Sequence, residues 1–85
     1  MYVVYVLRSL KDGKRYIGYT SDLPKRLKEH NSGKTESTKR RRPFDVVYKE
    51  EFQEEEDAKT REKFFKSGVG REELHKLLPG AVPKW

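Results

Sequence analysis

The sequence predicts a small α/β (α+β) domain, in which a three-stranded antiparallel sheet is flanked by helices in the order β-β-α-β-α-α. Runs with β-type alternation occur at residues 2–8, 15–20 and 44–52, and segments with helical apolar periodicity lie between and after them. In residues 2–8 both faces are apolar, which is typical of a central strand covered on both sides. These two observations carry the prediction.

The first two strands are expected to form a hairpin, because Asp12-Gly13 between them is a strong turn dipeptide. Alternation puts Tyr16 and Gly18 on one face, and Tyr5 joins them if the strands pair in that register. Two phenols and one glycine then form a small platform, where the missing side chain lets another backbone approach closely. Tyrosine is also simply common in hairpins, so this pattern alone does not indicate a site.

A first helix is expected over residues 22–31, with Ser21 or Asp22 as its N-cap. At about 100° per residue, Arg26 and His30 border its apolar stripe and lean toward the sheet. Taken singly, a flanking surface arginine and a histidine beside the helix C-terminal dipole are the simpler interpretations. Taken together, the two side chains form a candidate cationic site for a phosphate.

Residues 33–43 are polar and turn-rich, and they are expected to form a surface loop. The loop contains four consecutive cations, Lys39, Arg40, Arg41 and Arg42. Such a run can bind phosphates, serve as a localisation signal or simply be solvated. Phosphate contact is the favoured interpretation, because a separate candidate phosphate site lies nearby in the sequence.

A second helix is expected over residues 54–67, where an acidic first turn and a basic last turn both suit the helix dipole. Glu62 is the one carboxylate on its apolar face. The apolar residues that flank it on that face are Ala58, Phe65 and Val69. An inward carboxylate must be paired, hydrogen-bonded or metal-bound. The plainer interpretation is an internal salt bridge, for instance to Arg26 or Arg61.

The remaining chain is expected to add one short helix to the same domain. Gly68-Val69-Gly70 is interpreted as a break, and residues 71–78 as a helix that Pro79-Gly80 stops. The apolar stripe of this helix consists of Leu74, Leu77 and Leu78. Residues 1–80 are thus expected to be one domain and residues 81–85 a loosely packed tail.

Composition limits the class of protein. Only 33% of the 85 residues are hydrophobic and 40% are charged, with a net charge of +6 and a pI of about 9.6. A basic excess favours a polyanionic partner, most often nucleic acid. The chain contains no cysteine, which excludes disulfides and thiolate metal sites. No apolar stretch is long enough for a membrane span or signal peptide, so we expect a soluble cytoplasmic protein with no membrane partner.

The candidate site residues in chain order are Tyr5, Tyr16, Gly18, Arg26, His30 and Glu62. This ordered set resembles the GIY-YIG nuclease family, whose name comes from two tripeptides in a β-hairpin. Val3-Val4-Tyr5 stands in place of the first tripeptide, and Tyr16-Ile17-Gly18 matches the second. Arg26 and His30 match the Arg-x-x-x-His of the first helix, and Arg61-Glu62 resembles the metal-binding Glu segment.

The resemblance covers residues 2–78 and is closest to the stand-alone, single-domain members. No single piece is specific, whereas the ordered set at these spacings is. The sequence departs from the family pattern in two ways. Val3-Val4 replaces Gly-Ile, and the asparagine that some members carry after the Glu has no counterpart, since Asn31 is the only asparagine in the chain.

The resemblance implies a metal-dependent DNA endonuclease that hydrolyses phosphodiester bonds, with selectivity for branched or damaged DNA and a place in DNA repair. By resemblance, Glu62 would hold Mg²⁺ or Mn²⁺ and Arg26 would stabilise charge on the phosphate. Tyr5 or Tyr16 would act as general base or position the water. His30 would orient the water or a tyrosine, or contact phosphate.

Two other functions remain open at this point. The chain can be a nucleic-acid-binding module without catalysis, or a catalytic subunit directed to its target by a protein partner. The basic charge does not separate these functions, because all three need a basic surface. The sequence leaves the oligomeric state open.

Overall fold

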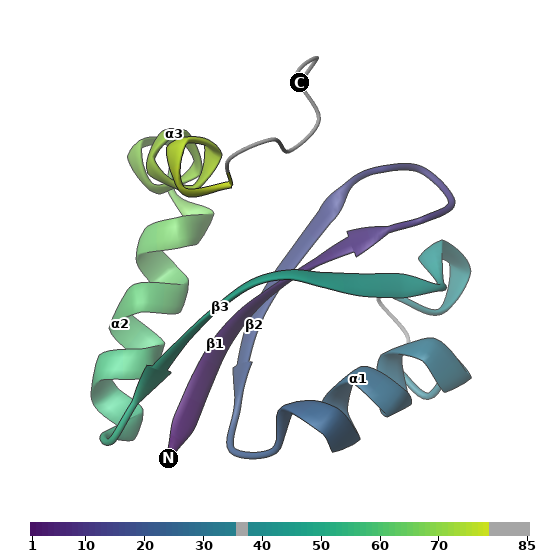
Figure 1. The fold of residues 1–85 in the computed structure, drawn as a ribbon, viewed down its shortest axis with the longest axis horizontal. Helices are drawn as coiled ribbons and strands as arrows, with labels where there is room; N and C mark the ends of the chain where they lie inside the picture. The colour runs from purple at the N-terminus through teal and green to yellow at the C-terminus, as the bar shows by residue number, and fades with distance from the viewer. Residues whose placement is uncertain (36–37, 79–85) are drawn as a thin grey trace.

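Over residues 1–35 and 38–78, which the computed structural model describes, one three-stranded antiparallel sheet forms the centre of the molecule (Figure 1). Its strands are β1 (Tyr2–Ser9), β2 (Arg15–Thr20) and β3 (Phe44–Phe52). The strand order is β2-β1-β3, with both pairs antiparallel. The central position predicted for the first strand is therefore confirmed, and β2 is an edge strand.

Helices cover both faces of the sheet. Figure 1 shows α1 (Leu23–Ser32) on one side, and α2 (Glu55–Lys66) with α3 (Gly68–Leu77) on the other. A short 3₁₀ helix, η1 (Lys39–Arg41), lies in the loop that precedes β3. The predicted element order and α+β class are confirmed.

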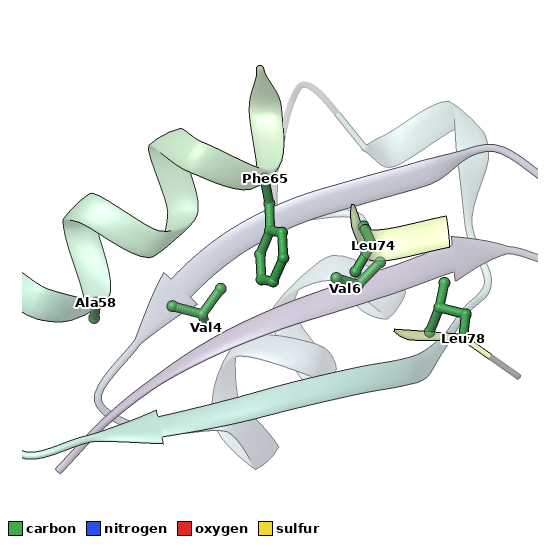
Figure 2. Close-up of a cluster of buried hydrophobic side chains, with 6 residues drawn as sticks. All are labelled: Val4, Val6, Ala58, Phe65, Leu74 and Leu78. Atoms are coloured by element: carbon green, nitrogen blue, oxygen red, sulfur yellow. The ribbon is translucent and has the colours of Figure 1, made fainter. Parts of the chain in front are cut away.

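Each face of β1 contributes to a separate core, as its alternation predicts. Toward α2 and α3 the buried core consists of Val4, Val6, Ala58, Phe65, Leu74 and Leu78 (Figure 2). Toward α1 it consists of Tyr5, Leu7 and Phe44, with half-buried Tyr16, Leu23, Leu27 and Val46 packed against them. Tyr5 and Tyr16 therefore share a sheet face, as expected.

A bulge in β3 corrects one expectation. The alternation of residues 44–52 predicts that Val46 and Tyr48 share a face with Phe44. In the structure Val6 pairs with Tyr48 while Leu7 pairs with Val46, so Val47 is an extra residue on β3. Val46 stays with the α1-side core, whereas Tyr48 packs on the α2-side core against Phe65.

The ends of α1 follow the sequence signals. Asp22 is the N-cap, and its Oδ1 accepts a hydrogen bond from the Lys25 backbone N–H at 3.2 Å. Pro24 lies in the first turn, and Gly33 ends the helix in the left-handed region at φ 85°. The helix begins and ends one residue later than the predicted range 22–31.

The break between α2 and α3 lies earlier than predicted. It falls at Ser67, whose side chain caps α3 by accepting from Gly70 N at 3.0 Å, so Gly68-Val69-Gly70 forms the first turn of α3. A Cβ on Gly70 would lie 1.6 Å from the Phe64 carbonyl oxygen, so only glycine permits this tight junction. Val69 consequently points to solvent, 68% exposed, and does not flank Glu62 as expected.

Some sequence predictions cannot be compared with the structure. The Pro79-Gly80 stop and the tail at residues 81–85 lie outside the described residues, as do two residues of the predicted loop 33–43. Among the helices that are described, none combines the length and the apolar character needed to cross a membrane.

Candidate active site

Gly18 makes room for the Tyr5 ring. The hairpin register places Tyr5 directly opposite Gly18. A Cβ on Gly18 would lie 2.6 Å from the Tyr5 hydroxyl oxygen and 2.8 Å from Cζ, closer than carbon atoms approach without displacement. The space that we expected another backbone to enter is thus occupied by a phenol. Gly18 itself is buried beneath it.

A buried hydrogen-bonded chain runs from Tyr5 through His30 to Thr38. The Tyr5 hydroxyl lies 3.1 Å from His30 Nε2, and His30 Nδ1 lies 2.8 Å from Thr38 Oγ1. None of the three residues is more than 1% exposed. The His30 ring comes from the inward edge of α1, as its helical position predicts, and it joins β1 to the loop before η1.

Burial controls the protonation of this chain. Burial lowers the pKa of His30, and the nearby Arg26 charge lowers it further against the opposing effect of Glu29. Burial also raises the pKa of Tyr5, an effect that the polar interaction with Arg26 partly offsets. Both side chains are therefore neutral at pH 7.

Tyr16 and Arg26 form the accessible side of the cluster. The Tyr16 ring packs edge-on against His30 with centroids 4.9 Å apart, and it remains half-buried. Arg26 donates to Glu29 Oε1 at 3.1 Å, and 36% of its side chain is exposed. Its interaction with Tyr5 raises the pKa of the guanidinium. A phosphate can therefore reach this cation.

Glu62 approaches the same edge of the sheet from α2. Burial is the main cause that raises the pKa of Tyr5 and of Tyr19, and the negative charge of Glu62 raises both further. Glu62 therefore acts electrostatically on tyrosines of both faces of the hairpin. Its side chain is 20% exposed, and Oε2 lies 3.3 Å from the exposed Lys66 ammonium.

The internal salt bridges considered for Glu62 are not formed. Arg26 pairs with Glu29, and Arg61 pairs with Glu50 at 2.8 Å. Arg61 also lies over the Phe65 ring, 4.4 Å from its centroid. Glu62 is thus a partly accessible carboxylate whose partner is a surface lysine.

The donor set fits a hard divalent cation held by one carboxylate. Within the described residues, no group of three or more His, Cys, Asp or Glu side chains could hold a metal ion. Mg²⁺ commonly binds through one or two carboxylates, with waters and substrate phosphate completing its shell. Glu62 would be the residue to supply such an oxygen ligand, and its partner Lys66 has a side chain that is 52% exposed.

The four cations of the basic segment are not equivalent. Lys39, Arg40 and Arg42 are exposed, whereas Arg41 is half-buried. The Arg41 guanidinium lies 3.3 Å from Asp12 Oδ2 and donates to the Arg15 carbonyl at 3.3 Å. Its own carbonyl accepts from the Ser9 hydroxyl. Arg41 therefore ties the segment to the hairpin tip.

Arg42 lies over the end of α1. A Cβ on Gly33 would be 1.8 Å from Arg42 Nη1, so the Arg42 side chain lies directly over this residue, whose φ of 85° is what requires glycine. The C-terminus of a helix favours a cation. The basic segment is thus packed between the hairpin and α1, next to the Tyr5–His30 chain.

Sequence reasoning missed Thr38 and Asn31. Thr38 lies in a polar loop with no periodicity, so no pattern separates it from its solvated neighbours. The Asn31 amide accepts from Phe44 N at 2.7 Å and donates to Phe44 O at 3.3 Å, which fixes the start of β3. Its place at the end of a helix gave only the weaker signal of a cap.

Comparisons with known proteins identify the family. Residues 1–74 match the model of the GIY-YIG catalytic domain. The UPF0213 protein SSP2268 of Staphylococcus saprophyticus is 36% identical over 78 residues, which are 91% of this chain and 94% of that protein. The UPF0213 protein YazA of Bacillus subtilis is 44% identical over 63 residues, 73% of this chain but only 63% of YazA.

A solved structure agrees with these matches. The solution NMR structure of the UPF0213 protein BH0048 from Bacillus halodurans has a TM-score of 0.56 and 38% sequence identity, and the alignment covers 98% of this chain and 89% of that one. The resemblance seen in the ordered residues from Tyr5 to Glu62 is therefore confirmed. The chain belongs to the GIY-YIG family and has that family's nuclease-type fold.

Proposed function

We propose that this protein is a divalent-metal-dependent endonuclease that hydrolyses phosphodiester bonds in DNA. The observation that carries the proposal is the meeting of two tyrosines, a guanidinium, a buried histidine and a carboxylate around the β2 edge. The residues are Tyr5, Tyr16, Arg26, His30 and Glu62. Phosphodiester hydrolysis needs a positioned water and neutralised phosphoryl charge, and these residue types supply both.

Arg26 is the phosphate-contacting residue in this proposal. Its guanidinium is accessible, and it interacts with Glu29 and with Tyr5. Guanidinium groups donate to two phosphate oxygens at once, which suits charge that develops on a phosphoryl group. The Glu29 partner lies at the surface, so a phosphate can replace it.

Tyr16 is the tyrosine that orients the attacking water. Tyr5 is 1% exposed and its hydroxyl is engaged by His30, which leaves it little room to contact a water on the substrate. Tyr16 lies above the same histidine and is accessible. Complete burial also favours one of the three roles considered for His30, namely that it orients a tyrosine.

Glu62 is the residue that would hold the cation. When bound, Mg²⁺ or Mn²⁺ supplies Lewis acidity to a phosphoryl oxygen. The carboxylate lies on a rigid helix whose Ala58 and Phe65 are fully buried against the sheet, so its position is fixed before substrate arrives.

The exposed cations of the basic segment extend the phosphate-binding surface. Substituting Lys39, Arg40 and Arg42 with alanine should flatten the slope of log K against log salt by about 0.9 for each lost contact with duplex DNA. Arg41→Ala is the matched control, because it removes a cation that already pairs with Asp12. An unchanged slope in the triple variant would mean that the segment is only solvated.

Cleavage of branched, flapped and linear DNA with Mg²⁺, Mn²⁺ or EDTA tests the proposal. Tyr16→Phe should abolish cleavage, whereas Tyr19→Phe should not, because the Tyr19 hydroxyl bonds to Glu55 across the other face. Preference for the branched DNAs would establish the proposed selectivity. Binding of every DNA without cleavage under any metal condition would favour the non-catalytic module, and cleavage that needs an added protein would favour the targeted subunit.

A further inference from the structure

Thr38 lies at the protected end of the hydrogen-bonded chain that leads to the site. It is fully buried, and its Oγ1 lies 2.8 Å from His30 Nδ1. We propose that Thr38 is a positioning residue that fixes the His30 imidazole in the tautomer with its proton on Nδ1. The consequence for catalysis rests on the function proposed above, whereas the tautomer does not.

The Thr35 carbonyl offers the Thr38 hydroxyl proton an acceptor other than His30. A hydroxyl has one proton to donate, and the Thr38 hydroxyl donates to the Thr35 carbonyl at 3.4 Å. With its proton directed at the Thr35 carbonyl, the Thr38 oxygen can accept from His30 Nδ1–H, which is the direction that we propose. The other ring nitrogen, Nε2, is left as an acceptor that faces Tyr5.

The surroundings of Tyr5 favour the same direction. The Arg26 guanidinium interacts with the Tyr5 oxygen, and a guanidinium can only donate. The favourable effect of Arg26 on the Tyr5 oxygen suits a phenol that turns its lone pair toward Arg26 and its proton toward His30 Nε2, 3.1 Å away. The opposite tautomer would direct two N–H groups at one phenol oxygen and leave the Tyr5 proton without an acceptor among the described residues.

The tautomer matters because the ring is neutral. Burial and the Arg26 charge both lower the pKa of His30, so the imidazole carries one proton rather than two. The charged groups that act on it are Arg26 and Glu29, both from α1. A neutral imidazole donates from one nitrogen and accepts at the other, so a partner of Nδ1 decides what Nε2 can do.

The orientation that Thr38 gives to His30 acts through Tyr5 on Arg26, the residue proposed to contact phosphate. Thr38 fixes His30, His30 accepts the Tyr5 proton, and the Tyr5 oxygen is left to Arg26. Removing the threonine hydroxyl leaves Nδ1–H without its acceptor. The ring can then regain a hydrogen bond only by changing its tautomer or turning, and either change releases Tyr5.

The loop holds Thr38 in place. The Arg41 backbone N–H donates to the Thr38 carbonyl at 2.9 Å, and the Arg41 carbonyl in turn accepts from Ser9. Thr38 is therefore tied through η1 to the end of β1, the strand that carries Tyr5. Both ends of the hydrogen-bonded chain, Tyr5 and Thr38, are therefore anchored to β1.

Long-range ¹H–¹⁵N NMR of the imidazole nitrogens tests the proposal on the folded protein. The wild type should show a protonated Nδ1 and an unprotonated Nε2 for His30, with His75 assigned from a His75→Gln variant. Thr38→Val keeps the shape but removes the hydroxyl, and it should change this signature. Thr38→Ser should keep it. Thr60→Val is the matched control, because its hydroxyl only bonds back to Glu56 within α2.

Cleavage assays complete the test. Groups that orient metal-bound histidines typically change metal affinity or activity by about 10–100-fold when removed. By analogy, Thr38→Val should cut the cleavage rate by about 10–100-fold, and Thr38→Ser should restore it. A wild-type proton on Nε2, or an unchanged signature in Thr38→Val, would overturn the proposal. If the NMR result holds but the wild type cleaves no DNA, the proposed function fails and the positioning role stands.

Discussion

The two faces of the sheet differ in the residues that they bury, although β1 contributes alternate residues to both. Toward α2 and α3 the core is apolar throughout its buried members, Val4 to Leu78. Toward α1 the buried set includes the polar His30 and Thr38 beside Tyr5. An apolar core needs only close packing, whereas a buried polar chain must satisfy each donor and acceptor. One face therefore contributes mainly stability, and the other holds groups in defined orientations.

The largest expected effect is a loss of stability on the apolar face. Phe65→Ala removes a fully buried ring between α2 and the sheet, and it should lower the free energy of unfolding by about 3–5 kcal/mol. Urea denaturation measures this loss. Val69→Ala on the exposed turn of α3 should stay within about 0.5 kcal/mol of wild type. Equal effects of the two variants would break the distinction between the faces.

A smaller loss is expected on the polar face. Tyr5→Phe keeps the ring under Gly18 but leaves His30 Nε2 without a donor, and an unsatisfied buried group costs about 1–3 kcal/mol. Urea denaturation is again the measurement, with Tyr19→Phe as the control at an exposed hydroxyl. A Tyr5→Phe variant as stable as wild type would mean that the hydrogen bonds of Tyr5, His30 and Thr38 contribute no stability.

The smallest effect is a pH dependence confined to the polar face. The pKa of His30 is lowered below its usual 6.5 by burial, so the unfolded chain binds a proton that the folded protein resists. The contribution of neutral His30 to the free energy of unfolding is therefore complete above about pH 6.5. It decreases as the pH falls below that value, with a limiting slope of about 1.4 kcal/mol per pH unit. His30→Gln should remove this slope and His75→Gln should retain it; equal slopes in both would assign the effect elsewhere.

Local signals in the sequence were sufficient for most of the fold. Asp12-Gly13, the helix cap at Ser21 or Asp22 and the alternation of β1 each depend on neighbours in the chain. The structure confirms the hairpin and the central strand, and it has Asp22 as the cap. The bulge at Val47 could not be predicted, because it depends on how β3 pairs with β1. The start of α3 was misplaced because Gly70, normally a helix breaker, here permits close contact with Phe64.

The candidate site was predictable only in part, because some of its contacts join residues without a local pattern in the sequence. Helical spacing was enough to place Arg26 and His30 on the inward edge of α1, and strand alternation placed Tyr5 with Tyr16. The partner of Glu62 was predictable but was missed, because Lys66 lies four residues further along the same helix and only Arg26 and Arg61 were considered. Thr38 lies eight residues from His30 across an irregular loop, so its hydrogen bond is visible only in three dimensions.

The central claim is that Glu62 serves the metal rather than the fold, and thermal melts with parallel cleavage assays of wild type and Glu62→Gln test it most directly. Each protein is measured with EDTA and with Mg²⁺ or Mn²⁺. Because the only pairing to be lost is with exposed Lys66 among the described residues, and such pairs contribute about 0–1 kcal/mol, the variant should be nearly as stable as wild type in EDTA. It should also cleave no DNA. A variant destabilised by about 3–5 kcal/mol, as expected for a broken buried pair, or one that still cleaves DNA, would contradict the account.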